Sequence, residues 1–367
     1  MINWADVRAK FPVTSRSVYL NTAAAGPLAE STAKAGALYY EQMRNDGDVH
    51  WDEWLARCEG VRRQVAEFIN AEPEEIGFTT NTSSGMNLII DALEKHGEVI
   101  SCDLEFPVTT IPWMHRRVPV HLVKSVDGVV RPEDLSAAMN TRTGVISMSY
   151  VQFSNGFRSD LEELGSIKGN HAFVVNASQA AGVFEIDVKR MKIDALCATG
   201  HKWMRSGYGS GFVYISKELQ AASRQRTIGW LSVQDPYGMR NDEVHLRHDV
   251  ASRAELGCLH FAGVFALGAS IELIQSIEIE NIQARALELN RKLTSRLEGK
   301  VLSPLGEERF RSAETLVAAE EPAKIVSHLA QQNIFVTEKP QGFRVSTDFF
   351  NNEDDIDQLL DRITGFA

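Results

Sequence analysis

The chain has 367 residues, which is enough for a large core and suggests about two domains. Its 44% hydrophobic and 24% charged residues are ordinary for a soluble globular protein, and no apolar stretch is long enough to cross a membrane. The formal net charge of −11 argues against a nucleic-acid-binding surface. We therefore expect neither a membrane nor a nucleic-acid partner.

The N-terminal residues 1–13 carry charges throughout and contain no apolar core segment, so we predict no secretory signal. The four cysteines form no CxxC pair; they are Cys58, Cys102, Cys197 and Cys258. This spacing favours free thiols in a reducing, cytoplasmic location over disulfides. His245 and His248 have helical spacing, but no carboxylate or cysteine set accompanies them, so we predict no metal site.

Short β-branched segments alternate with helical patterns, which is typical of an α/β fold with a largely parallel sheet. The predicted strands cover residues 76–79, 98–101, 120–122, 144–150, 172–175, 195–198 and 211–215. A helix is predicted over 84–96, and Gly97 ends it. Its apolar face consists of Met86, Ile89, Ile90 and Leu93.

The pattern changes near residue 251, where a long helical region begins and continues to 297. Shorter elements follow, and residues 342–364 predict a strand and then a terminal helix. We therefore predict a large α/β domain over 16–250 and a small α+β domain over 251–367, which residues 1–15 join.

Lys202 lies between two segments that read as buried strands, in the sequence LCATGHKWMRSGYGSGFVYI (196–215). One interpretation is a solvated loop lysine. The other is a nucleophile, because partial burial lowers the pKa of an amine and only the neutral amine attacks a carbonyl. The glycines after Lys202 open onto a strand rather than a helix, which argues against a dinucleotide-binding fingerprint.

Six segments, in order along the chain, resemble those of class V aminotransferases, the fold type I pyridoxal phosphate (PLP) enzymes that include cysteine desulfurases and isopenicillin N epimerase. They are YLNTAAAGPL (19–28), TTNTSSGMNLI (79–89), DLEFP (103–107), VVNASQAAG (174–182), the Lys202 segment and FRVSTDFFNN (343–352). The resemblance implies a mostly parallel seven-stranded sheet and PLP held by Lys202 as a Schiff base. It also implies a homodimer with its active site at the subunit interface.

The resemblance assigns roles to individual residues. Lys202 is the catalytic residue, and the implied cofactor-binding residues are Ser83, Ser84, Gly85, Phe106, Asn176, Gln179, Thr199 and His201. The implied substrate-binding residues are Asn21, Ala24, Gln152 and Arg344. In these roles Ser83, Ser84, Gly85, Thr199 and His201 face the phosphate, Phe106 stacks on the ring, and Gln179 binds the phenolic oxygen.

Simpler alternatives remain open for several of these positions. Residues 82–85 read equally as an ordinary helix N-cap, and Phe106 as a core aromatic at a strand end. Gln152 is either a substrate contact or a polar residue at the end of a strand. Arg344 is either a surface arginine or the residue that binds the substrate carboxylate through its planar guanidinium. The surrounding motif favours the second interpretation.

The sequence departs from the family pattern at three places. Asn176 stands where the family has an aspartate opposite the pyridine nitrogen, which predicts a weaker electron sink. The segment FVTEKPQGF (335–343) lacks the mobile cysteine of the desulfurases. In ELGCLHFAG (255–263), Cys258 stands where a threonine of the partner subunit normally reaches the phosphate.

These observations predict an enzyme that acts on the Cα and Cβ of an L-amino acid through an external aldimine. Asn176 and the missing loop cysteine favour β-elimination with C–S cleavage of a cysteine conjugate. A class V aminotransferase, an epimerase or a decarboxylation-linked deaminase remains an alternative. A protein that binds PLP without turnover is a further alternative, which the intact set of Lys202, His201, Gln179 and Arg344 opposes.

Overall fold

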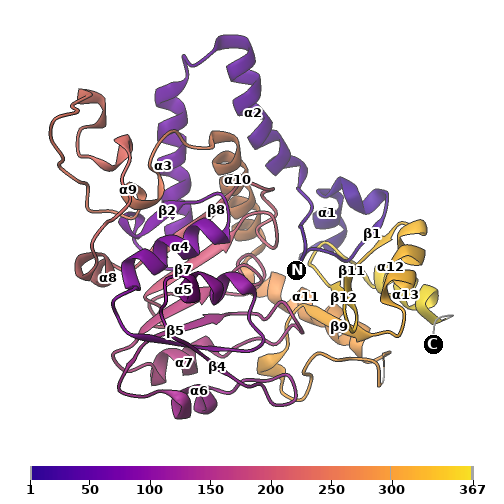
Figure 1. The fold of residues 1–367 in the computed structure, drawn as a ribbon. Coiled ribbons are helices and arrows are strands. Elements are labelled where there is room, and N and C mark those ends of the chain that lie inside the picture. Colours follow the sequence, from indigo (N-terminus) through magenta and orange to yellow (C-terminus); the bar gives the residue numbers. More distant parts are fainter. Residues whose placement is uncertain (1, 298, 365–367) are drawn as a thin grey trace.

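In the computed structural model, which describes residues 2–297 and 299–364, a seven-stranded sheet runs through the larger part of the molecule (Figure 1). Its strands lie in the order β2-β8-β7-β6-β5-β3-β4, and only β8 is antiparallel to its neighbours. They are β2 (Ile76–Phe78), β3 (Glu98–Cys102), β4 (Val120–Val123), β5 (Thr143–Ser149), β6 (Ala172–Asn176), β7 (Ala195–Thr199) and β8 (Gly211–Ile215). All seven predicted strands and the mostly parallel sheet are confirmed.

Both faces of this sheet are buried, so its central strands are apolar on both sides. In β5, Val145 belongs to the core under α4 (Thr82–Leu93), and the next residue, Ile146, belongs to the core on the opposite face. All four residues of the predicted apolar helix face lie in the α4 core, which confirms that helix. It begins two residues earlier than predicted and ends before Gly97.

A long arm formed by α2 (Glu30–Asp46) and α3 (Trp51–Phe68) extends away from the sheet (Figure 1). The remaining helices of the larger part are short; they are α5 (Ile111–His115), α6 (Pro132–Ala138), α7 (Leu161–Ile167), α8 (Lys217–Ala222) and α9 (Ala251–Ala254). The helix α10 (Phe261–Ile277) packs against both helices of the arm. It is buried along almost its whole length, which explains its continuous apolar sequence.

The predicted helical region over 251–297 is divided into α9, α10 and α11 (Ile279–Thr294). An irregular segment separates α9 from α10, and Glu278, with a φ of 70°, separates α10 from α11. Among the described residues no single helix is long and apolar enough to span a membrane. Among these residues, the pair α10 and α11 taken together has the length and composition of a membrane span, but the two helices are bent by 80° relative to each other.

A smaller part has its own core. It contains the sheet β11 (Thr337–Lys339), β12 (Gly342–Ser346) and β9 (Glu314–Ala318), and the parallel pair β1 (Val18–Tyr19) and β10 (Ile334–Phe335). Its helices are α1 (Trp4–Ala9), α11, α12 (Pro322–Gln331) and α13 (Glu353–Ile363). The domain division stays a prediction, but the packing of α10 on α2 and α3 favours a boundary near Glu278 rather than 250.

Candidate active site

A pocket of about 210 Å³ opens at the carboxyl ends of β5, β6 and β7, beside the N-terminus of α4. Its lining residues are Asn81, Thr82, Ser83, Phe106, Ser149, Val151, Phe153, Asn176, Ser178, Gln179, Thr199, His201 and Lys202. Parallel α/β sheets bind ligands at this edge because the loops after the strands and the helix N-termini meet there. Seven of the predicted site residues, Ser83, Phe106, Asn176, Gln179, Thr199, His201 and Lys202, therefore share one pocket.

Lys202 follows β7 in a loop that the N-terminal segment holds in place. Gly26 donates its backbone N–H to the carbonyl oxygen of His201 at 2.7 Å, and a Cβ at position 26 would lie 2.2 Å from the carbonyl oxygen of Lys202. Burial, with a contribution from Arg344, lowers the pKa of Lys202 from 10.5 to about 8. At pH 7 about a tenth of such an amine is neutral, far more than of an ordinary lysine, so it is suited to nucleophilic attack.

The first turn of α4 forms another wall of the pocket. Asn81 caps the helix, since its side-chain oxygen accepts a hydrogen bond from the backbone N–H of Ser84 at 3.0 Å. Thr82 shares a hydrogen bond of 2.5 Å with the hydroxyl of Ser178. The backbone N–H groups of a first helical turn and the positive end of the helix dipole suit a phosphate.

Ser84 and Gly85 lie outside this pocket, in contrast to Ser83. The side chain of Ser84 bonds back to the carbonyl of Asn81 at 2.8 Å and lines a neighbouring pocket. A Cβ at position 85 would lie 2.9 Å from the Cβ of Cys197, so Gly85 allows α4 to pack closely on β7. The N-cap is Asn81, one residue before the predicted 82–85, and the phosphate contact predicted for this turn stays a prediction.

His201 and Thr199 form a hydrogen-bonded pair at the end of β7. The hydroxyl of Thr199 lies 2.7 Å from Nδ1 of His201, whose ring stacks on Tyr208 with 4.3 Å between centroids. Burial and then the nearby Lys202 lower the pKa of His201 to about 4. The imidazole is therefore neutral at physiological pH and acts as a hydrogen-bonding group in the pocket.

Asn176, at the end of β6, has a fixed amide orientation. Its Oδ1 accepts the backbone N–H of Ser178 at 3.1 Å, and its Nδ2 donates to the hydroxyl of Thr109 at 3.3 Å. A backbone N–H can only donate, so the atom facing it is the amide oxygen. The nitrogen of Asn176 keeps a second hydrogen that is available to an acceptor in the pocket.

Gln179 is held by two neighbours. Its Nε2 donates to the carbonyl of Ala23 at 3.0 Å, and its Oε1 accepts the indole N–H of Trp203 at 2.9 Å. The amide oxygen is therefore engaged, while the nitrogen retains one hydrogen for an oxygen acceptor in the pocket. That remaining donor is compatible with the predicted contact to a phenolic oxygen.

Phe106 is 43% exposed and lines the pocket, which makes it a pocket aromatic rather than a core residue. The amine nitrogen of Lys202 lies 5.8 Å from the centroid of its ring. Phe153 packs edge-on against Phe106 with centroids 5.0 Å apart. An exposed ring beside the amine offers a flat apolar surface for an aromatic cofactor.

Gln152 does not line the pocket, and its placement favours the interpretation as a polar strand-end residue. It is fully buried, and its Nε2 donates to Glu105 at 2.6 Å and to Cys102 at 3.5 Å. Glu105 also accepts the backbone N–H and the hydroxyl of Ser149, each at 2.5 Å. Burial raises the pKa of Glu105. Our sequence interpretation assigned no role to Glu105, although it lies in the quoted DLEFP motif.

Arg344 is buried on β12, which excludes the surface alternative. Its Nη1 donates to Glu314 at 3.1 Å and to the carbonyl of Phe153 at 3.4 Å. Its Nε is buried and has no partner among the described residues. A buried guanidinium with an unused edge is suited to bidentate binding of a carboxylate. No periodic pattern in the sequence distinguishes Glu314 from an ordinary strand residue.

Neither of the two predicted substrate-binding residues near the N-terminus, Asn21 and Ala24, is among the residues that line the pocket. Asn21 accepts a hydrogen bond from Thr337, and the backbone N–H of Ala24 donates to the carbonyl of Asn21 at 2.9 Å. The hydrogen bond from Thr337 to Asn21 ties the 21–26 turn to the small sheet, and the same turn covers the Lys202 loop. Their predicted contact with substrate stays a prediction.

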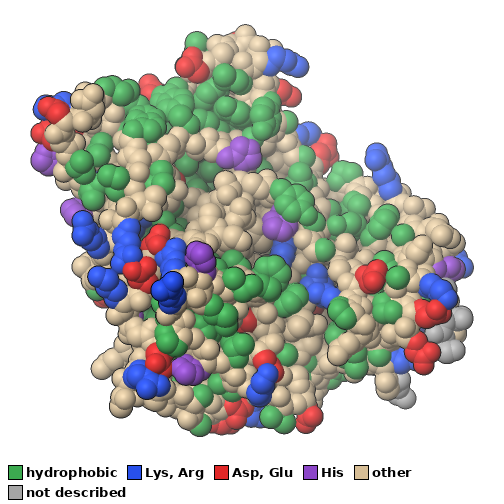
Figure 2. Space-filling model, viewed as in Figure 1, with side chains coloured by type: hydrophobic (Ala, Val, Ile, Leu, Met, Phe, Trp, Pro, Cys, Tyr) green, Lys and Arg blue, Asp and Glu red, His purple; other side chains and the backbone are tan. Residues whose placement is uncertain are grey.

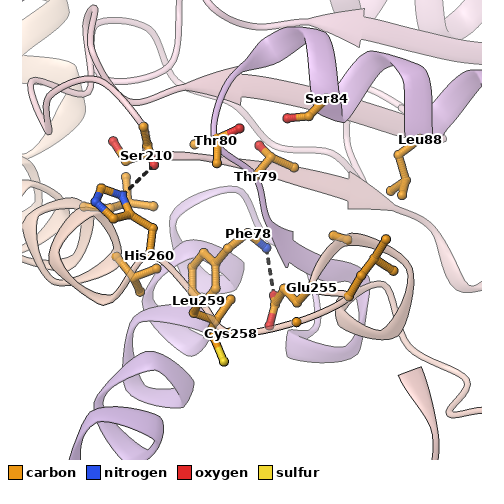
Figure 3. Close-up of a pocket in the computed structure, with 17 residues that line it drawn as sticks. Phe78, Thr79, Thr80, Ser84, Leu88, Ser210, Glu255, Cys258, Leu259 and His260 are labelled. Carbon is orange, nitrogen blue, oxygen red and sulfur yellow. Dashed lines mark hydrogen bonds between the residues drawn. The ribbon is translucent and has the colours of Figure 1, made fainter. Parts of the chain in front are cut away.

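A second pocket lies on the other side of the α4 N-terminus, between β2, β8 and the segment after α9 (Figure 3). Glu255 accepts the backbone N–H of Phe78 at 2.8 Å, and it pairs with the buried Arg62 at 2.6 Å. Cys258 and His260 lie on the same segment, and Cys258 is exposed. The other three cysteines are buried, and burial raises their pKa values.

The residues of the Lys202 pocket fit a PLP molecule. They provide an amine with a lowered pKa, an exposed aromatic ring, one free amide hydrogen on each of Asn176 and Gln179, and the first turn of a helix. An aldehyde, an aromatic ring with polar substituents and a phosphate each find a suitable partner in this set.

Comparison with known proteins agrees with this geometry. The family described as Aminotransferase class-V matches residues 18–359. A probable cysteine desulfurase of Methanothermobacter thermautotrophicus is 29% identical over 300 residues, which cover 78% of this chain and 74% of that protein.

Two solved structures share the fold across nearly their whole length. An apo cysteine desulfurase from Thermococcus onnurineus NA1 has a TM-score of 0.90 at 24% identity and covers 100% of this chain and 98% of its own. The cystine C-S lyase C-DES, in complex with its product cysteine persulfide, has a TM-score of 0.86 at 21% identity, with coverages of 97% and 100%. With the family match over most of the chain, the conclusion is that this protein belongs to the class-V aminotransferase family and is a PLP-dependent enzyme of fold type I.

Proposed function

We propose that the protein catalyses β-elimination with C–S cleavage of an S-substituted L-cysteine. With water as the second reactant, the products are a thiol, pyruvate and ammonium. The observation that carries this proposal is the asparagine at position 176, whose amide oxygen is occupied by the backbone N–H of Ser178. The cystine C-S lyase among the structural neighbours supports the same class of reaction.

PLP, when bound, supplies an aldehyde that takes up the substrate amino group and a ring that withdraws electrons from Cα. Lys202 is the group placed to remove the Cα proton, because a free amine with a pKa of about 8 is an effective general base near neutral pH. The neutral His201 and Thr199, together with the α4 N-terminus, hold and orient the phosphate end. Arg344 offers its unpaired edge to the substrate carboxylate.

Asn176 favours elimination over amino transfer. An amide that donates a hydrogen bond stabilises an unprotonated pyridine nitrogen, whereas the family aspartate stabilises the protonated form. An ion pair at about 4 Å is worth roughly 4 kcal/mol at an effective dielectric constant near 20, or on the order of three pKa units. Elimination expels its leaving group once Cα has lost its proton, so it depends less on a strong electron sink than amino transfer does.

The hairpin before Arg344 argues against a desulfurase with a mobile cysteine. β11 and β12 pair directly, with Lys339 opposite Gly342, so only Pro340 and Gln341 form the turn. This two-residue turn contains no cysteine. The thiols of Cys102 and Cys197 are buried with raised pKa values, which opposes a role as sulfur acceptors.

The test is to incubate the PLP-loaded protein with a panel of S-substituted cysteines, with and without a keto acid, and to identify products by mass spectrometry. We expect thiol and pyruvate in equal amounts without the keto acid, and no product from a Lys202→Ala variant. Turnover that strictly requires the keto acid would instead identify an aminotransferase. Racemised substrate without pyruvate would identify an epimerase.

We infer that the enzyme is a homodimer, that it is located in the cytoplasm and that its substrates are amino acids. Hydrophobic side chains gather over the upper part of the face shown in Figure 2, the region of the α2–α3 arm and the segment before α9. Exposed apolar residues of these two regions include Tyr40, Met43, Val49, Trp230, Tyr237, Met239 and Val244. Such a patch is typical of an interface between subunits. Sedimentation of the purified protein tests this inference.

A further inference from the structure

Three charged side chains, one from each strand, lie on the same face of the small sheet. Arg344 is on the central strand β12, Glu314 on β9 and Lys339 on β11. The register pairs Ser346 with Glu314 and Lys339 with Gly342, so each flanking residue is a diagonal neighbour of Arg344. Side chains two residues apart on a strand, and directly paired side chains on adjacent strands, share a face.

The three groups interact electrostatically and lie close to Lys202. Arg344 donates to Glu314 at 3.1 Å, and both charges influence the pKa of Lys339 and of Lys202. The amine of Lys339 lies 4.6 Å from the ring centroid of Phe153, which itself lines the Lys202 pocket. The cluster therefore stands at one end of the pocket, beside the aromatic pair of Phe153 and Phe106.

Two buried polar atoms of the cluster have no partner among the described residues: Nε of Arg344 and Oε1 of Glu314. An unpaired buried donor on a guanidinium is costly, which indicates that a ligand completes it. Burial raises the pKa of Glu314, whereas the charges of Arg344, Lys202 and Lys339 lower it. In its ionised form Glu314 neutralises Arg344, so this pair alone has little net attraction for another anion. The third charged residue on this face of the sheet, Lys339, adds a further positive charge beside the pair.

We propose that Lys339, Arg344 and Glu314 together form the carboxylate site, in which Lys339 restores the positive charge that Glu314 removes from Arg344. Arg344 supplies the directional hydrogen bonds, Glu314 holds its guanidinium in place, and Lys339 determines the affinity for anions. This inference rests on the proposed amino-acid substrate.

The charge balance also defines the substrate class. Two cations and one carboxylate leave a net charge of +1, which one substrate carboxylate brings to zero. A second anionic group would leave an uncompensated negative charge in a partly buried site, which is unfavourable. The cluster therefore selects amino acids whose side chains are neutral, such as thioether conjugates of cysteine, over those with acidic side chains.

Binding of propionate tests this site without any chemistry, because propionate has a carboxylate but no amino group. Isothermal titration calorimetry with the PLP-loaded protein at pH 7 would compare propionate with succinate. The variants are Lys339→Gln, Lys339→Arg, Glu314→Gln and the double variant with both glutamines. Glu338→Gln is the matched control, because Glu338 is exposed on the opposite face of β11.

We expect Lys339→Gln to weaken propionate binding by about tenfold or more, Lys339→Arg to retain it, and Glu338→Gln to leave it unchanged. Glu314→Gln should strengthen binding of succinate more than that of propionate. The double variant restores the net charge and should bind propionate within about threefold of the original protein. The wild-type protein should prefer propionate to succinate.

Unchanged binding in Lys339→Gln would overturn the proposal, and so would a Glu314→Gln variant that binds neither anion more tightly. Because propionate binding needs no turnover, these outcomes are independent of the lyase proposal. An enzyme that transfers amino groups could still show the predicted carboxylate site. Conversely, a lyase whose Lys339→Gln variant keeps its KM would refute the site and leave the proposed reaction intact.

Discussion

The amide oxygen of Asn176 accepts the backbone N–H of Ser178 at 3.1 Å, and this contact fixes which atom of the side chain can face the cofactor ring. In an Asn176→Asp variant, one carboxylate oxygen can keep the bond to Ser178 while the other presents a negative charge. We expect the pyridine nitrogen of bound PLP to become protonated, with its pKa raised by on the order of three units.

Spectrophotometric pH titration of the PLP-loaded wild type and Asn176→Asp would measure this shift. We expect amino transfer to a keto acid to accelerate relative to elimination in the variant. An Asn176→Ala variant controls for loss of the amide itself. Identical titration curves for the wild type and the aspartate variant would refute the weakened electron sink.

The pKa of Lys202 predicts how PLP uptake depends on pH. Burial lowers this pKa from 10.5 to about 8, so the neutral fraction rises about tenfold per pH unit below 8 and levels off above it. The rate at which the apo-protein binds PLP covalently should follow the same curve. Stopped-flow absorbance from pH 6 to pH 10 measures it, and a rate that keeps rising to pH 10 would indicate an ordinary solvated lysine.

Carboxylate binding should weaken as the pH rises through about 8. Burial and then the positive charge of Arg344 lower the pKa of Lys339 to about 8, while Glu314 opposes this shift. The groups that face it are Arg344, Glu314, Lys202 and the ring of Phe153. Above this pH Lys339 is neutral, and the net attraction for propionate falls.

Calorimetric titrations at pH 6.5 and pH 9.5 would show the loss of affinity. Lys339→Gln removes the titrating amine, so its propionate affinity should be lower at pH 6.5 and nearly independent of pH. An equally steep pH dependence in that variant would assign the titration to another group.

The glycine at position 26 is required by a close backbone approach. In Gly26→Ala, the new methyl group would lie 2.2 Å from the carbonyl oxygen of Lys202, so the Lys202 loop must move. We expect PLP affinity to fall by more than about tenfold and stability to fall by about 1–3 kcal/mol. Equilibrium dialysis and urea denaturation measure the two effects. Gly306→Ala is the control, since a Cβ there meets nothing within 4 Å.

The buried ion pair of Arg205 and Asp348 joins the Lys202 loop to the segment after β12. Nε of Arg205 lies 3.0 Å from Oδ2 of Asp348, and both side chains are buried. Asp348→Asn leaves the guanidinium without its counter-ion and should destabilise the protein by about 3–5 kcal/mol.

Urea denaturation would measure this loss. Glu321→Gln removes one member of the exposed pair that it forms with Lys324 and should change the free energy of unfolding by less than about 1 kcal/mol. A similar small effect for both variants would mean that the buried pair does not link the two parts of the fold.

Much of the fold was predictable because its signals are local. The seven strands of the large sheet follow from short apolar, β-branched segments, and the face of α4 from the spacing of Met86, Ile89, Ile90 and Leu93. The motif around Lys202 identified the pocket, since its residues are contiguous in the sequence and end a buried strand. The departure at Asn176 was also visible in the sequence, because Asn176 lies within the contiguous motif VVNASQAAG (174–182).

Relations between distant segments required the tertiary structure. Ser84 and Gly85 adjoin Ser83 in sequence, yet the rotation of about 100° per helical residue directs them to another pocket and to β7. The sequence left Gln152 open between a substrate contact and a strand-end polar residue, and in the structure its amide nitrogen donates to Glu105, a buried carboxylate 47 residues earlier. The spacing of residue types along the sequence does not indicate such a pairing.

The sequence by itself determined the family, the parallel sheet and the lysine, because each depends on the chemistry and order of neighbouring residues. Only the tertiary structure decided the charge around Arg344. Glu314, Lys339 and Arg344 come from three strands, and their charges act together because sheet register makes them neighbours. The net charge at a site depends on which charged residues lie close together in space, and the order of residues along the chain does not show this.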